Sequence, residues 1–162
     1  MMGSRLRVAL LALALGSIVP AAAQAQTRRL HLGPHLGYEF NDENAVLGAQ
    51  FSVPIARRLE FYPSFDYYFV DPGSLWALNG DFKYRVARGR PDWLYIGSGI
   101  NFADRSAGGS SSTSAGWNLL AGVESLRGWV HPFGEARFTI SDNSRFQLQA
   151  GLNFTLGRHG RR

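Results

Sequence analysis

Hydrophobic and polar residues alternate with a period of two along most of the chain after residue 28. From Leu59 onward, for example, every second residue is apolar, whereas Glu60 and Asp66 fall on the opposite face. A period of two places successive side chains on opposite sides of a β-strand, and it does not fit the 3.6-residue repeat of a helix. We therefore predict a β-strand wherever the pattern holds.

Eight segments show this alternation, and residues that favour turns separate them. Because most connections are short, we expect an up-and-down antiparallel sheet in which each strand lies beside its sequence neighbours. One connection is long: residues 103–114 contain a Gly-Gly-Ser-Ser-Ser-Thr-Ser tract that is typical of a flexible loop. Leu120 interrupts the alternation. The predicted strands are 29–40, 45–55, 59–69, 76–86, 94–102, 116–124, 130–140 and 146–156.

The start of the chain has a different pattern. Arg5 and Arg7 precede an apolar run from Val8 to Val19, and Ala23-Gln24-Ala25 matches a signal-peptidase site. The run is too short for a membrane-spanning helix. We predict a cleaved signal peptide over 1–25 and a single barrel domain over 26–162.

Alternation alone does not say which face is inside, and a soluble lipocalin-like barrel would bury the apolar one. Side-chain volume decides between the two arrangements, since an eight-stranded barrel has an interior just wide enough to be filled by side chains. Large apolar side chains occupy most positions of the apolar face, whereas glycines lighten the polar face. We therefore predict an all-β fold, an eight-stranded transmembrane β-barrel with its apolar face in outer-membrane lipid. The glycines of the polar face are Gly33, Gly37, Gly48, Gly97, Gly99, Gly116, Gly122 and Gly151.

The polar face carries charges of both signs, which can neutralise one another in a narrow interior. An unpaired buried charge would cost several kcal/mol. We predict a network of ion pairs that fills the barrel, and the functional alternative is a gated ion path. The members of the predicted network are Glu60, Asp66, Lys83, Arg85, Glu124, Glu135 and Arg137.

Composition narrows the function classes. The chain has no cysteine, so neither disulfides nor a lipid-bearing cysteine can contribute to it. A net charge of +5 is compatible with nucleic-acid binding. We reject that partner because export removes the protein from nucleic acid and the arginines are scattered among turns.

With these features the chain resembles the small eight-stranded outer-membrane proteins: the transmembrane domain of outer-membrane protein A, outer-membrane protein X and the opacity-type surface proteins. The last strand also resembles the C-terminal signal that the barrel assembly machinery recognises, through Gln149, Gly151, Phe154 and Leu156, although the chain continues to Arg162. The resemblance implies a monomer in the cell outer membrane that periplasmic chaperones and the assembly machinery handle during export.

The resemblance also raises the question of lipid A chemistry. Deacylases of this size use a His-x-Ser pair, which none of the four histidines provides. Palmitoyl transferases add an amphipathic N-terminal helix, for which residues 26–29 leave no room. His31 and His131 are candidates for a two-histidine site, but interior hydrogen bonding is the simpler interpretation. We expect no enzyme activity, cofactor or metal, and a role in envelope integrity or surface interaction; a narrow pore or hydrophobic-solute conduit is the alternative.

Overall fold

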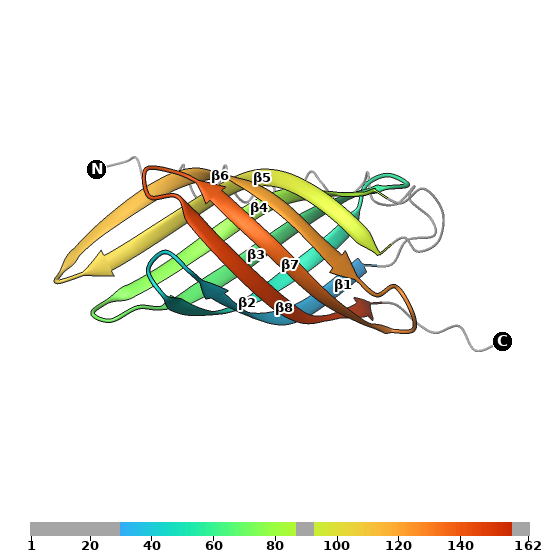
Figure 1. Ribbon diagram of the computed structural model, residues 1–162, viewed down its shortest axis with the longest axis horizontal. Helices are drawn as coiled ribbons and strands as arrows, with labels where there is room; N and C mark the ends of the chain where they lie inside the picture. Colours follow the sequence, from blue (N-terminus) through green and yellow to red (C-terminus); the bar gives the residue numbers. More distant parts are fainter. Residues whose placement is uncertain (1–29, 87–92, 157–162) are drawn as a thin grey trace, which may run out of the picture.

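The computed structural model describes residues 30–86 and 93–156, which form eight strands closed into one antiparallel barrel (Figure 1). Each strand pairs with its sequence neighbours, and β1 pairs with β8 to close the sheet. The predicted signal peptide lies outside the described residues. Within the described ranges, no helix is long and apolar enough to cross a membrane. The strands are β1 (Leu30–Glu39), β2 (Asn44–Pro54), β3 (Leu59–Phe69), β4 (Ser74–Arg85), β5 (Leu94–Ala107), β6 (Ser110–Glu124), β7 (Val130–Ile140) and β8 (Arg145–Leu156).

The barrel has two distinct ends, which Figure 1 shows at the left and right of the view. The left end, here called the hairpin end, carries the turns 40–43, 70–73, 108–109 and 141–144. The right end, here called the opposite end, carries the turns 55–58 and 125–129, together with the start of β1 and the end of β8. The strands run obliquely between the two ends, as closure of a sheet into a barrel requires.

The polar face lies inside and the apolar face outside, as predicted from side-chain volume. Glu39 and Asp66 on the inner face are fully buried, whereas Leu36 on the outer face is 67% exposed. The same alternation of buried and exposed residues runs along the part of each strand that belongs to the closed barrel. A soluble protein places most of its large apolar side chains in its core, whereas most of those in the described part of this chain face outward.

Leu120 follows the alternation rather than interrupting it, which corrects the interpretation made from the sequence. It lies on the inner face of β6, opposite Gly97 of β5, and only 4% of it is exposed. A Cβ atom on Gly97 would come within 2.5 Å of Leu120 Cδ1. The glycine therefore leaves room for the leucine inside the barrel.

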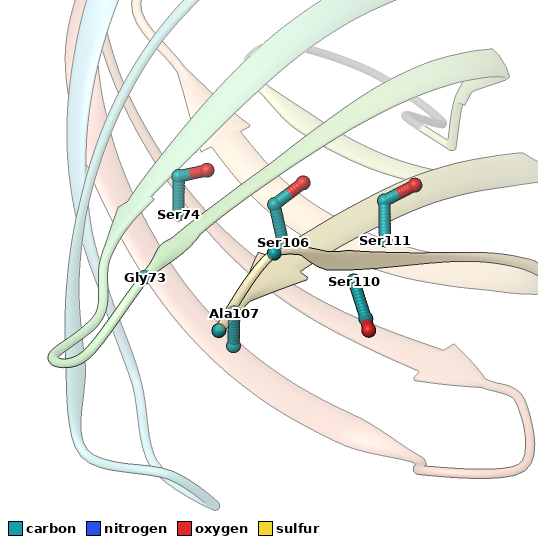
Figure 2. A pocket seen from close by; sticks show the side chains of 8 residues that line it. Gly73, Ser74, Ser106, Ala107, Ser110 and Ser111 are labelled. Carbon is teal, nitrogen blue, oxygen red and sulfur yellow. The ribbon is translucent and has the colours of Figure 1, made fainter.

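The serine-rich segment 103–114 is not a flexible loop, and that prediction is wrong. β5 and β6 continue through it as a paired hairpin up to Ala107 and Ser110, joined by two glycines. Gly108 and Gly109 have φ angles of 59° and 84°, and two positive φ angles are what a tight type I′ hairpin turn requires. Because both faces of this projecting hairpin are exposed, its sequence shows no alternation. Figure 2 shows the serines at its tip.

Candidate functional site

The barrel interior concentrates the ionisable groups of the chain. Ten charged side chains of the described residues point inward, and none of them is more than 8% exposed. Six are carboxylates and four are basic. All seven residues of the predicted network are among them. The ten are Glu39, Glu60, Asp66, Asp81, Lys83, Arg85, Glu124, Glu135, Arg137 and Arg145.

Arg85 bridges two carboxylates toward the opposite end of the barrel. Its Nε donates to Glu60 Oε1 at 2.7 Å, and its Nη2 donates to Glu124 Oε2 at 2.7 Å. The three residues come from β4, β3 and β6, so one guanidinium joins two neighbouring strands to a third that is not paired with either. Ser52 and Asn153 each donate a hydrogen bond of 2.7 Å to one of the two carboxylates. Charge-assisted bonds of this length are about twice as strong as neutral ones.

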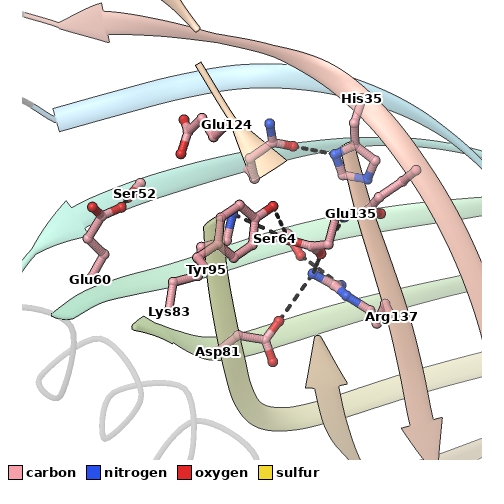
Figure 3. Close-up of polar contacts among 12 residues, drawn as sticks. His35, Ser52, Glu60, Ser64, Asp81, Lys83, Tyr95, Glu124, Glu135 and Arg137 are labelled. Atoms are coloured by element: carbon pink, nitrogen blue, oxygen red, sulfur yellow. Dashed lines mark hydrogen bonds and ion pairs between the residues drawn. The ribbon is translucent and has the colours of Figure 1, made fainter. Parts of the chain in front are cut away.

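Arg137 holds the centre of the interior (Figure 3). Its Nη1 lies 3.2 Å from Asp66 Oδ2, and its Nη2 lies 3.2 Å from Asp81 Oδ2 and 3.0 Å from Glu135 Oε1. One buried cation therefore faces three carboxylates. Asp81 was not among the residues predicted for the network, although alternation places it on the inner face.

Lys83 is enclosed by aromatic rings as well as by charge. Its Nζ lies 3.3 Å from Glu135 Oε2, 3.2 Å from the ring centre of Tyr62 and 4.1 Å from that of Tyr95. The Tyr95 hydroxyl donates to the same Glu135 oxygen at 2.9 Å. An ammonium over the face of an aromatic ring is attracted by the negative charge of the ring face. The alternation predicts both tyrosines on the inner face, but nothing in the sequence indicated that they would enclose Lys83.

Asn153, Gln50 and His35 connect the two charge clusters into one network. Asn153, which binds Glu124, accepts a hydrogen bond of 2.7 Å from Gln50. Gln50 in turn contacts the His35 ring, whose Nε2 lies 2.7 Å from Asp66. Hydrogen-bonded side chains thus run from Arg85 to Arg137 without interruption.

Inside the hairpin end, apolar side chains pack beside the charges of Glu39 and Arg145. They form a cluster beside the turns 40–43 and 70–73, with Val70 packed against it. Nothing in the sequence marked this cluster separately, because it consists of inward positions that happen to be apolar. The cluster and the charge network both lie inside the barrel. The members are Val46, Tyr68, Leu75, Ala77 and Ala103.

His31 and His131 meet at the opposite end, where their ring centres are 4.7 Å apart. Both nitrogens of His131 have hydrogen-bond partners, the Ser125 carbonyl and the Thr155 hydroxyl, each at 2.8 Å. In the part of the chain that the structure describes, no three His, Cys, Asp or Glu side chains are grouped so as to hold a metal ion. The geometry of His131 is that of an interior hydrogen-bonding residue.

The residues of the predicted assembly signal divide between the two faces of β8. Gln149 lies inside and donates to Glu135 Oε1 at 2.7 Å, and Gly151 also faces the interior. Phe154 faces outward and packs against Trp129, with ring centres 5.7 Å apart, and Leu156 is 42% exposed. Recognition of this strand by the assembly machinery stays a prediction.

A double-mutant cycle tests the contact between Glu60 and Arg85. We expect Arg85→Met to destabilise the protein, and adding Glu60→Met to recover part of the loss, with a coupling energy of about 1–3 kcal/mol. Recovery is partial because Glu124 keeps its charge and loses the same arginine. Chemical unfolding in detergent or lipid measures all four proteins of the cycle. Additive effects would contradict a direct pair.

Comparison with known proteins supports the fold alone. No protein-family model matches the chain, and no curated protein matches it by sequence. Among solved structures, the N-terminal β-barrel domain of Pseudomonas aeruginosa OprF is similar, with a TM-score of 0.61 and 13% identity over 78% of this chain and 96% of that domain. Neisserial surface protein A has a TM-score of 0.56 and 17% identity, with coverage of 78% and 96%. This chain has the fold of the small eight-stranded outer-membrane barrels.

The third similar structure shows how far the likeness extends. It belongs to a set of de novo designed transmembrane β-barrels and has a TM-score of 0.55 and 10% identity, with 79% of this chain and 95% of that chain covered. A designed barrel has nearly the same TM-score to this chain as two natural ones, so the outer-membrane barrel fold does not by itself indicate an activity. The function has to be argued from the side chains.

Proposed function

We propose that this protein is a non-enzymatic integral barrel of the cell outer membrane, in which it contributes to envelope integrity and presents its β5–β6 hairpin at the cell surface. The observation that carries the proposal is the inverted distribution of side chains. Large apolar groups such as Leu36 and Trp117 are about half exposed or more on the outer wall, whereas all ten interior charges are buried. Outer-membrane lipid is the partner that such an apolar wall fits.

The filled interior supports a structural role over the pore alternative. Side chains that line a water-filled channel keep much of their surface accessible to solvent, but Asp66 and Asp81 are 0% exposed and Arg137 is 1% exposed. The apolar cluster of the hairpin end adds a second obstruction beside the charge network. The burial of Asp66, Asp81 and Arg137 therefore favours a filled interior over an open channel.

Aromatic side chains near the strand ends fit the proposed membrane position. Trp129 and Phe154 pack together at the opposite end, and Phe40 contacts Phe146 at the hairpin end with ring centres 5.6 Å apart. Aromatic girdles of this kind belong at the two interfaces of a bilayer. Export through the signal peptide and handling by chaperones and the assembly machinery are part of the same proposal.

Conductance across a planar bilayer distinguishes the two roles. We expect the protein to give no steady conductance, because buried side chains of the described residues occupy the middle of the barrel. The double variant Lys83→Ala and Arg85→Ala, which removes bulk and charge near the opposite end, should give intermittent openings and serves as the positive control. Steady conductance from the unmodified protein would favour the pore.

The absence of cysteine allows the orientation to be tested with single-cysteine variants. We expect Ser110→Cys, at the exposed tip of the hairpin, to react with a membrane-impermeant maleimide on intact cells. Arg57→Cys, in an exposed turn of the opposite end, should react only after the outer membrane is permeabilised. The reverse result would invert the proposed orientation.

A further inference from the structure

The outer wall of the barrel is hollowed over β4, β5 and β6. The hollow, here called the wall depression, has a volume of about 780 Å³. Its floor includes two small outward residues that lie diagonally across neighbouring strands: Gly80 on β4, which pairs with Ile100, and Ser98 on β5, which pairs with Phe82. Its walls are formed by large side chains, among them Phe82, Ile100 and Trp117.

Gly80 is not required by the fold, unlike the glycines inside the barrel. A Cβ atom on Gly80 would meet only Ile100 Cγ1 at 3.6 Å and Phe61 Cε2 at 3.9 Å, which are ordinary contacts. By contrast, a Cβ atom on Gly99 would come within 2.5 Å of the Asp81 Cα atom. The φ angle of Gly80 also lies outside the left-handed region. A glycine inside a strand weakens it and often marks a close approach by a ligand.

The chemistry of the wall depression is apolar. Ser98 is a hydroxyl at its floor, but that hydroxyl donates to the Asn118 backbone carbonyl at 2.9 Å. Among the described residues that line the hollow, none is charged. Phe82, Ile100 and Trp117 are 47%, 45% and 52% exposed, so their apolar surfaces are available to an occupant. The Trp117 indole and the Tyr84 hydroxyl are the remaining polar groups of this lining, which is too few to satisfy a sugar, a headgroup or a polar peptide.

From these observations we propose that the wall depression is a binding site for one acyl chain of a membrane lipid. This inference rests on the proposed membrane position, because the hollow is continuous with the apolar outer wall that faces lipid. Bulk lipid is as apolar as the site, so selectivity comes from dispersion contacts with the surrounding side chains rather than from the hydrophobic effect. A chain lying between Phe82 and Trp117 is contacted from the floor and both sides, whereas elsewhere it touches a convex wall.

Photolabelling tests the proposal. The probe is a phosphatidylcholine with a diazirine in the middle of one acyl chain, mixed into vesicles that contain the full chain. We expect labelling at Ile100 and Trp117 to exceed that at Leu148 and Leu152 by about threefold, because of the additional dispersion contacts. The two leucines are a fair reference, since they face outward on β8 and are 44% and 42% exposed.

Filling the hollow should abolish the excess. Gly80→Leu and, independently, Ser98→Leu are expected to bring labelling at Ile100 down to that of the β8 leucines. Gly134→Leu is the matched control, because Gly134 faces outward on β7 and an added Cβ atom there meets nothing within 4 Å. It should leave the labelling unchanged.

Three results would overturn the acyl-chain site. The first is uniform labelling around the wall, and the second is an excess of labelling at Ile100 that survives both filling variants. The third is an unlabelled β4–β6 face with crosslinks between copies, which would mean that a second copy covers the hollow. A protein that takes up no label anywhere on its outer wall would instead contradict the membrane position itself. The two failures are therefore distinguishable.

Discussion

Replacing Arg137 with methionine is expected to lower the free energy of unfolding by about 3–5 kcal/mol, the loss found when one partner of a buried ion pair is removed. Arg137 is 1% exposed and lies within 3.2 Å of three carboxylate groups, those of Asp66, Asp81 and Glu135. Methionine keeps most of the side-chain volume but leaves these negative charges facing one another. Lys83 keeps its contact with Glu135, whereas Asp66 and Asp81 lose the arginine that lies between them.

Chemical unfolding in detergent micelles or lipid vesicles measures this loss. Arg57→Met is the control, because Arg57 lies in an exposed turn, where substitutions usually change stability by no more than about 0.5 kcal/mol. Adding Asp81→Asn to Arg137→Met removes one of the uncompensated charges and should recover part of the loss. Lowering the pH should also reduce the difference in the free energy of unfolding between variant and parent. The variant is destabilised by carboxylates that have lost their cation, and protonation removes the charge of these carboxylates. Equal stability of Arg137→Met and Arg57→Met would mean that the network does not hold the barrel together.

Much of the architecture was predictable because a strand in a two-sided sheet has a simple sequence pattern. Alternation places Glu60 and Arg85 on the inner face, and an up-and-down order puts their strands side by side. The 2.7 Å ion pair between these two residues agrees with that prediction. The inner and outer faces followed from volume, since an interior this narrow has room for glycines and charges but not for a full set of aromatic rings.

What could not be predicted is how the inward side chains of neighbouring strands pack against one another. Lys83, Tyr62 and Tyr95 come from the adjacent strands β4, β3 and β5, and their contact depends on how the sheet curves around the interior. Leu120 seemed to interrupt the pattern because the space that receives it is created by Gly97 on another strand. Alternation marks which residues face inward but not how they fill the interior.

The hairpin was missed for a different reason. Alternation arises when one face of a strand is buried and the other is not, and residues 110–113 are exposed on both faces. Serine tracts are also common in flexible linkers. The signal that was present is the Gly-Gly pair at 108–109, since two adjacent glycines between strands favour a tight hairpin turn. A two-residue turn joins the two strands directly, so no long loop between them is needed.

The proposed membrane position leads to the second large effect. Leu36→Arg is expected to oppose insertion of the barrel by about 2–4 kcal/mol if the residue faces the middle of the bilayer. Leu36 is 67% exposed on the outer wall, and its strand neighbours Leu47 and Ala150 also face outward. In a soluble protein, a substitution at so exposed a position would change stability by no more than about 0.5 kcal/mol. The same mutation therefore has very different consequences in water and in lipid.

Leu126→Arg provides a control with the same chemical change at another depth. Leu126 is 40% exposed in the turn between β6 and β7, where the proposed position places it at the interface rather than in the hydrocarbon. Near an interface, an arginine costs only about 0–1 kcal/mol. Reversible folding into lipid vesicles, followed by the tryptophan fluorescence of the four native tryptophans, gives both values on one scale. A large penalty at Leu36 with a small one at Leu126 requires a hydrocarbon layer around the middle of the barrel. Small and equal penalties would mean that water surrounds the whole wall, and neither the outer-membrane role nor the acyl-chain site would then stand.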